Sequence, residues 1–531
     1  MSALNLAHSL HRLIEDAASD SPAIFFEDQI VTFGHMRSRA AALAAGLRAR
    51  GLRRGDRLAI WLDNGIDWIV VALACSKLGL GMVVLNVRWS SKEVVDMLTR
   101  TRSKVIVTSS TQREGACVAA LKHMNPATVG ALELVILVGD GGDTFAFDID
   151  QVNLSTIEQT GGVDFSDGHP DDEALILATS GTTSSPKLIV HEQASVCRHA
   201  ADVAHASGLH EEGVRMMLAV PMCGAYGYTI LIAALEAQCP IVLMQAFRPA
   251  EAADLINRHA VTHMLGTNDM LDKLLDHSER SPTFPTLRLF GYANFVPSLT
   301  QLPAKAERRG VQIRGFYGMS ELLAGFAIQP SGAPLLQRSE GGGRPVSDQA
   351  CFVIRDPESG ATVARGEVGE LQVQTKNKLR GYLDDQRTTA AAFTEDGFFR
   401  TGDLAYELPD GCFVFVSRMN DVLRIGGYLV APAEIEDVLA EDDDFAAVQV
   451  VATRMGTGVR PVAFVVMRPS ARLDEAAAVA RCRRNLAIYK VPARVFAIDE
   501  IPMISSANGR KVKRSELRAL AEKLISVEER R

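Results

Sequence analysis

The feature that most constrains the fold is a repeated alternation of short apolar runs with longer amphipathic segments. Short apolar runs bounded by polar residues or glycine are typical of buried β-strands, and here they lie at 57–62, 104–108, 132–138, 174–179, 215–220 and 240–244. Helical spacing of apolar residues occurs between them, at 36–50, 91–101 and 227–237. Strands that alternate with helices predict parallel-type sheets flanked by helices.

The pattern changes near residue 345. Short strands punctuated by glycine and aspartate follow, in "QACFVIRD", "GELQVQT" and "GCFVFVSR", with few helices between them. They predict a β-rich flank at about 345–419. From 420 the pattern is compact α+β, with helices at 434–440 and 473–486 and strands at 446–452, 461–467 and 494–498.

The predicted fold class is therefore α/β, with a large N-terminal body of parallel-type sheets flanked by helices and carrying the β-rich flank. A small, mobile α+β C-terminal domain follows. We place the boundary between an N-terminal domain at 1–419 and a C-terminal domain at 420–531, whose size is typical of one small domain.

Composition excludes several classes of protein. The net charge of −8 argues against a nucleic-acid binder. The eight cysteines are scattered and form no C-x-x-C pair, which favours a reducing, cytoplasmic location over a disulfide scaffold. The most apolar stretch, 68–87, contains Lys77 between two halves that fit a helix and a buried strand, so we expect no integral membrane segment.

One segment suggests phosphate binding. The sequence "LATSGTTSSPKLIVHEQ" (177–193) places six hydroxyl side chains around Gly181 and then adds Lys187, directly after an apolar run. It does not fit the Walker template, which needs glycine before the lysine and Ser or Thr after it. Hydroxyls and backbone N–H groups in such a turn can still hold phosphate oxygens.

Two further segments carry chemistry. In "GFYGMSE" (315–321), Tyr317 offers a flat face for a base, Ser320 a hydroxyl and Glu321 a carboxylate suited to Mg²⁺. In "FFRTGDL" (398–404), Asp403 follows a glycine where a carboxylate can accept two ribose hydroxyls. Each of these residues alone also has an ordinary structural interpretation, as a turn cap, a helix start or a surface charge.

Together with "SRMNDVLRIGGYLVAPAEIE" (417–436) and "NGRKVKRSELR" (508–518), these segments resemble the adenylate-forming superfamily of acyl-CoA synthetases, amino-acid adenylation domains and firefly-type luciferases. The resemblance extends from "VTFGHM" at residue 31 to "VKRSELR". It implies ATP, Mg²⁺ and CoA as cofactors and two half-reactions: a carboxylate attacks the α-phosphate of ATP, and a thiol then displaces AMP from the acyl-adenylate.

The resemblance also implies roles for individual residues. The catalytic residues are Lys511, Glu321, Ser320 and Lys187, of which Glu321 is the metal ligand. The nucleotide is held by Thr179, Ser180, Gly181, Thr182, Thr183, Gly291, Tyr292, Ala293, Phe316, Tyr317, Gly318, Asp403 and Arg418. The acid is held by Met222, Cys223, Gly224, Tyr226, Asn294 and Met319. Arg424, Gly426 and Gly427 form the CoA loop, and Asn420 is the hinge between the domains.

Several positions depart from the family pattern. Ser184 and Leu188 replace two glycines of the phosphate-binding loop. Gly224 stands where a His or an aromatic residue is usual, which should leave space beside the reacting carboxylate. The hinge is the uncharged Asn420 rather than Asp or Lys. An additional basic residue, Arg510, competes with Lys511 for the role of catalytic cation, although a guanidinium is not equivalent to an ammonium.

These residues favour an ATP-dependent acid–CoA ligase for an aromatic, alicyclic or medium-chain carboxylic acid. No aspartate in "PMCGAYGY" (221–228) is available to pair with an α-amino group, which disfavours amino-acid adenylation. Two alternatives stay open: an acyl-AMP ligase that loads a carrier protein, and a non-catalytic nucleotide or acyl sensor. Homodimerisation also stays open. A serine hydrolase is excluded, because "GMSEL" lacks the closing glycine of a nucleophile elbow.

Overall fold

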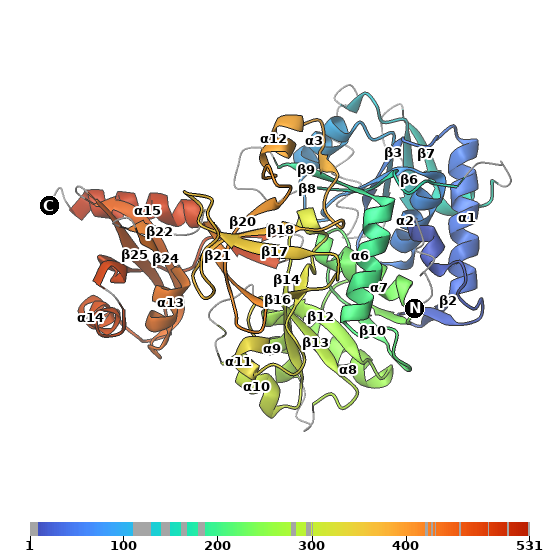
Figure 1. Ribbon diagram of the computed structural model, residues 1–531. Coiled ribbons are helices and arrows are strands. Elements are labelled where there is room, and N and C mark those ends of the chain that lie inside the picture. Colours follow the sequence, from blue (N-terminus) through green and yellow to red (C-terminus); the bar gives the residue numbers. More distant parts are fainter. Residues whose placement is uncertain are drawn as a thin grey trace.

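The computed structural model describes residues 9–109, 129–139, 149–160, 167–178, 186–277, 283–293, 299, 301–419, 423–425, 428–430, 432–455, 458–486, 488–506 and 509–528. It has a large α/β body and a smaller C-terminal domain, which lies beside β20 and β21 and far from α1 (Figure 1). This arrangement confirms the predicted fold class.

The first sheet of the body has eight strands in the order β19-β9-β8-β4-β3-β5-β6-β7. Their bounds are β3 Arg57–Trp61, β4 Gly81–Val84, β5 Val105–Ser109, β6 Leu134–Val138, β7 Asp150–Asn153, β8 Glu173–Ala178, β9 Leu188–Glu192 and β19 Gly381–Tyr382. The strands from β8 to β7 are parallel, whereas β9 and β19 add antiparallel pairs at one edge. The predicted strands in this region are confirmed.

The second sheet has thirteen strands in the order β17-β18-β20-β21-β16-β15-β14-β13-β12-β10-β11-β1-β2. Its body strands are β1 Pro22–Phe26, β2 Gln29–Thr32, β10 Met216–Leu218, β11 Ile241–Leu243, β12 His263–Thr267, β13 Leu289–Ala293, β14 Ile313–Tyr317, β15 Ala327–Ile328 and β16 Gly342–Pro345. The β-rich flank contributes β17 Cys351–Arg355, β18 Gly369–Gln374, β20 Phe399–Glu407 and β21 Phe413–Arg418. Because β21 pairs with β16, the flank continues the hydrogen-bonded sheet of the body.

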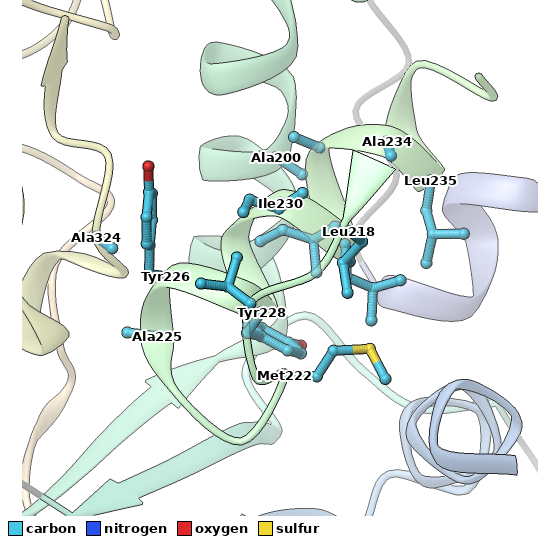
Figure 2. Close-up of a cluster of buried hydrophobic side chains, with 14 of the residues drawn as sticks. Ala200, Leu218, Met222, Ala225, Tyr226, Tyr228, Ile230, Ala234, Leu235 and Ala324 are labelled. Carbon is cyan, nitrogen blue, oxygen red and sulfur yellow. The ribbon is translucent and has the colours of Figure 1, made fainter. Parts of the chain in front are cut away.

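Two helices, α6 (Gln193–Ala206) and α7 (Ala225–Glu236), lie between the two sheets (Figure 1). All residues of α7 except its last are buried, because apolar side chains surround the helix on every side. Figure 2 shows part of this core, in which Ile230, Ala234 and Leu235 of α7 lie close to Leu218 and Ala200.

The body has further helices around the two sheets. They are α1 Phe33–Ala49, α2 Ile66–Leu78, α3 Ser91–Thr101, α5 Leu154–Glu158, α8 Pro249–Arg258, α9 Asn268–Asp276, α10 Leu302–Arg308, α11 Leu335–Arg338 and α12 Gln386–Ala391. The apolar stretch 68–87 divides as predicted into α2, a left-handed turn at Gly79 (φ 72°) and β4. Among the described residues, no helix has both the length and the apolar character that a membrane span requires.

The C-terminal domain has its own core. Its elements are β22 Leu423–Ile425, β23 Tyr428–Val430, α13 Pro432–Ala440, β24 Phe445–Met455, β25 Gly458–Met467, α14 Glu475–Asn485, β26 Arg494–Ala497, β27 Met503–Ser506, β28 Gly509–Val512 and α15 Arg514–Glu528. The predicted helices and strands of this domain are confirmed, whereas the β27–β28 hairpin and α15 were not predicted. Strand β22 packs against β24 and β25, so this strand belongs to the C-terminal domain.

Candidate active site

The carboxyl ends of β13 and β14 bring together two of the predicted nucleotide segments. The strands are parallel neighbours, with Tyr292 opposite Gly315, so Ala293 and Tyr317 end at the same edge of the sheet. This edge is where open α/β sheets place ligands. Gly291 is required by packing here, since a Cβ would lie 2.6 Å from Leu265 and 2.8 Å from Phe316.

Tyr317, Asp403 and Arg418 form a polar cluster at this edge, in which Tyr317 and Asp403 are buried and Arg418 is exposed. The hydroxyl of Tyr317 donates a 2.6 Å hydrogen bond to Oδ2 of Asp403, and Nε of Arg418 lies 3.0 Å from Oδ1 of Asp403. The register of β20 and β21 places Asp403 directly opposite Arg418. Burial and the Asp403 carboxylate raise the pKa of Tyr317, so the phenol stays protonated as a donor.

Ser320 and Glu321 lie in a short 3-10 helix (Ser320–Leu322) directly after β14 and Gly318–Met319. Nε2 of His191 lies 2.8 Å from the Ser320 carbonyl, and the backbone N–H of Leu379 donates to the Glu321 carbonyl at 2.8 Å. Burial lowers the pKa of His191 to about 4, so the neutral ring can donate to the Ser320 carbonyl. The segment that carries Glu321 is therefore held at two of its backbone carbonyls, by the His191 ring and by the Leu379 N–H.

A left-handed turn follows this helix. Leu323, Ala324 and Gly325 have φ values of 59°, 56° and 57°, a conformation that costs about 1–2 kcal/mol for each residue with a Cβ. The hydroxyl of Thr229 in α7 donates to the Leu323 carbonyl and helps to hold the turn. The turn also explains Gly318, because a Cβ there would lie 2.3 Å from the backbone nitrogen of Gly325.

The side chain of Glu321 fits a magnesium ligand. It is 8% exposed, and Oε1 accepts a 3.1 Å hydrogen bond from the neutral hydroxyl of Tyr382. No group of three or more His, Cys, Asp or Glu side chains that could hold a metal occurs in the described part of the chain. Mg²⁺ is commonly held by one or two carboxylates together with substrate phosphates, so a single glutamate beside a phosphate site suits it.

The predicted acid-binding residues lie at the start of α7. Met222 and Cys223 precede the helix, and Gly224 is its N-cap with φ −110° and ψ 152°. The hydroxyl of Tyr226 lies 3.4 Å from each of the Gly266 and Gly291 carbonyls, so this side chain links α7 to β12 and β13. Figure 2 shows Tyr226 between α7 and the segment that carries Ala324.

A small apolar cavity adjoins Tyr226. It has room for about one water molecule, and its lining includes Val203, Ile230, Ala233 and Leu265. Burial raises the pKa of the nearby Cys223 thiol to about 11, so this cysteine stays a neutral thiol. Met319, 8% exposed, lies just after the end of β14.

Part of the predicted site lies outside the described residues. Thr179, Ser180, Gly181, Thr182, Thr183, Asn294, Asn420, Gly426 and Gly427 fall there. The backbone of Lys511 lies in β28, opposite Ile504, and the backbone of Arg424 lies in β22, opposite Leu429. The structure therefore assigns Lys511 and Arg424 to the C-terminal domain by their backbones.

Two side chains near Glu321, those of Tyr382 and His191, were not identified from the sequence. Nζ of Lys187 lies 4.9 Å from the ring centroid of Tyr382, whose hydroxyl contacts Glu321. His191 could have been found, because positions 187, 189 and 191 share one face of a strand. No comparable local signal indicates Tyr382, since its neighbours are decided by the pairing of β19 with β9.

Comparison with known proteins agrees with this geometry. A model of AMP-binding enzymes matches residues 14–383, and a model of the C-terminal domain of AMP-binding enzymes matches residues 434–508. A 3-[(3aS,4S,7aS)-7a-methyl-1,5-dioxo-octahydro-1H-inden-4-yl]propanoyl:CoA ligase of Mycobacterium tuberculosis is 30% identical over 96% of this chain and 98% of its own.

A 2-succinylbenzoate–CoA ligase of Geobacillus kaustophilus is 29% identical over 93% of each chain. The crystal structure of ATP-bound MatB from Rhodopseudomonas palustris superposes with a TM-score of 0.84 at 25% identity, covering 98% of this chain and 99% of that one. One family model matches the body and the other matches the C-terminal domain, and these relatives match almost the whole chain. The chain therefore belongs to the family of AMP-binding enzymes.

Proposed function

We propose that the protein is an ATP-dependent acid–CoA ligase that activates an aromatic or alicyclic carboxylic acid through an acyl-adenylate. The observation that carries this proposal is the arrangement at the end of β14. There, the buried Asp403 carboxylate, held by Tyr317 and by the exposed Arg418, suits a nucleoside. Tyr317 lies a few residues before Glu321, whose carboxylate suits the metal bound to the phosphates of the nucleotide.

The chain's own residues have distinct tasks in this reaction. Asp403 accepts ribose hydroxyls, and Gly291, Tyr292, Ala293 and Phe316 surround the base. Magnesium bound at Glu321 would neutralise charge on the phosphates. Lys187 and Lys511 supply positive charge while a carboxylate oxygen of the acid attacks the α-phosphorus and pyrophosphate leaves. The CoA sulfur then attacks the carbonyl carbon, and AMP leaves.

The nature of the acid follows from the apolar surroundings of Tyr226. The cavity that adjoins Tyr226 is apolar, and the buried Met222, Cys223 and Met319 carry no charge. Relatives that match almost the whole chain are named for acids with ring systems. Because Gly224 has no side chain, we expect room at the start of α7 for an acid with a bulky ring close to its carboxylate.

The acceptor in this proposal is free CoA, because the similar proteins named above are CoA ligases. The C-terminal domain would rotate about Asn420 between the half-reactions, bringing Lys511 to the acid first and the loop of Arg424, Gly426 and Gly427 to CoA afterwards. The independent core of this domain supports such a movement. The free cysteines of the described residues support a reducing, cytoplasmic location.

A pyrophosphate-release assay over a panel of carboxylic acids, with and without CoA, tests the proposal. We expect ring-containing acids to release pyrophosphate, CoA to accelerate turnover, and the acyl-CoA to accumulate. Release without thioester formation, followed by loading of a carrier protein, would identify an acyl-AMP ligase. Binding of ATP with no release for any acid would identify a sensor.

A further inference from the structure

Tyr382 contacts two residues of the candidate site that come from different parts of the chain. Its hydroxyl donates a 3.1 Å hydrogen bond to Oε1 of Glu321, and its ring centroid lies 4.9 Å from Nζ of Lys187. The side chain is 8% exposed. A single buried ring is therefore in contact with both the carboxylate proposed to bind the metal and the ammonium proposed to bind phosphate.

The backbone around Tyr382 is firmly held. Strand β19 pairs with β9, with Tyr382 opposite Ile189, and the N–H of Leu383 donates to the Leu188 carbonyl at 2.8 Å. Because Lys187 immediately precedes β9, this register places Tyr382 beside it. The N–H of Tyr382 also donates to Oγ1 of Thr389 in α12 at 2.9 Å.

The segment of Glu321 is held by the same stretch of chain that carries Tyr382. The carbonyl of Glu321 accepts a hydrogen bond from the N–H of Leu379, three residues before Tyr382. The backbone contact fixes where the residue lies, and the contact of Tyr382 with Oε1 fixes how the carboxylate is turned. Carboxylates that bind metals are commonly hydrogen-bonded in this way, and loss of such a partner typically lowers metal affinity about 10- to 100-fold.

We propose that Tyr382 is a positioning residue: its hydroxyl orients the Glu321 carboxylate toward the divalent metal, and its ring holds the Lys187 ammonium next to that site. The inference rests on the proposed function, because it assumes that Glu321 binds the metal that accompanies ATP. It goes beyond that function by assigning to one side chain of the β-rich flank the positioning of both the metal ligand and the lysine.

Two substitutions separate the tasks of the hydroxyl and the ring. Tyr382→Phe keeps the ring and removes the donor. We expect Mn²⁺, measured by electron paramagnetic resonance in the presence of ATP, to bind about 10- to 100-fold more weakly than to the wild type. ATP affinity without metal should not change, and saturating Mg²⁺ should restore pyrophosphate release. Tyr382→Leu also removes the ring, so its rate should stay low at saturating Mg²⁺.

Tyr406→Phe in β20 is the control with the same chemical change, because Tyr406 is partly buried and lies outside the candidate site. It should leave Mn²⁺ affinity unchanged. A double-mutant cycle with Glu321→Gln tests the route of the effect: in that background, Tyr382→Phe should cause no further loss of Mn²⁺ binding.

Unchanged Mn²⁺ affinity in Tyr382→Phe would overturn the inference while leaving the ligase proposal intact. Equal losses in the wild-type and Glu321→Gln backgrounds would show that Tyr382 does not act through Glu321 and would also overturn it. A wild-type protein that binds no Mn²⁺–ATP and releases no pyrophosphate would instead overturn the proposed function. A loss of cooperative thermal unfolding in Tyr382→Phe would assign the residue to fold stability alone.

Discussion

The hydroxyl of Tyr317 at the end of β14 donates a 2.6 Å hydrogen bond to the carboxylate of Asp403 in β20. Both side chains are less than a tenth exposed, at 6% and 2%. A buried carboxylate is stable only when its oxygens receive donors or ion-pair partners. Tyr317 therefore helps to attach the β-rich flank to the body, and it is also one of the residues proposed to bind the nucleotide.

We expect Tyr317→Phe to lower the free energy of unfolding by about 1–3 kcal/mol, because it leaves a buried carboxylate with one donor fewer. Chemical denaturation measures this change, and ATP affinity should fall with it. Tyr406→Phe is the control with the same chemical change. Wild-type stability in Tyr317→Phe would mean that Asp403 has sufficient other donors.

Glu321→Gln keeps the size of the side chain and removes its charge. We expect the Mg²⁺ concentration needed for half-maximal pyrophosphate release to rise at least about tenfold, while the melting temperature changes little. Titration of the assay with Mg²⁺, together with thermal unfolding, measures both quantities. An unchanged Mg²⁺ dependence would show that the metal is held by another residue.

Lys511→Ala should slow adenylation about 10²- to 10³-fold, since a charge directed at the reacting phosphorus is lost. Thioester formation from a supplied acyl-adenylate should persist, because Lys511 is proposed to act in only one position of the C-terminal domain. The two half-reactions are assayed separately, with Arg510→Ala as the comparison. Equal loss of both, or a defect confined to Arg510→Ala, would contradict the assignment.

Gly224→His should select against bulky acids. The φ of −110° at Gly224 is accessible to any residue, so the substitution strains no backbone, and the imidazole adds volume at the buried start of α7. Overpacking of about 1–3 kcal/mol corresponds to a fall of about 5- to 150-fold in kcat/KM for the preferred bulky acid. Acetate-sized acids and ATP should be little affected. A uniform decline across all acids would contradict a role in selectivity.

His191 should make stability depend on pH. Burial lowers its pKa in the folded protein to about 4, whereas an unfolded histidine titrates near 6.5. The unfolded chain therefore binds the proton first as the pH falls, and stability is lost between about pH 6.5 and 4. Between pH 7.5 and 4.5, the wild type should lose about 2–3 kcal/mol more than His191→Gln.

Denaturation curves at several pH values measure this difference. The stability of both proteins should still fall with pH to the same further extent. Burial also lowers the pKa values of His11, His199 and His263 to about 4, and these residues are present in both proteins. Parallel stability curves for the two proteins would show that His191 does not titrate in this range.

Much of the fold could be predicted because its signals are local. The apolar runs at 57–62 and 174–179 became β3 and β8, since strand formation depends on the apolar residues of the run itself. Likewise, Tyr317, Glu321 and Asp403 were identified from short segments. That Asp403 lies beside Tyr317 was decided by the tertiary structure, since β20 pairs antiparallel with β18 and β21.

Tertiary structure alone decided the contacts between distant segments. The pairing of β21 with β16 joins the flank to the body, the pairing of β19 with β9 places Tyr382 beside Lys187, and the hydroxyl of Thr229 holds the left-handed turn at Leu323. None of these follows from local propensity. Strand pairing depends on which edges remain open, and a strained turn persists only where surrounding groups hold it.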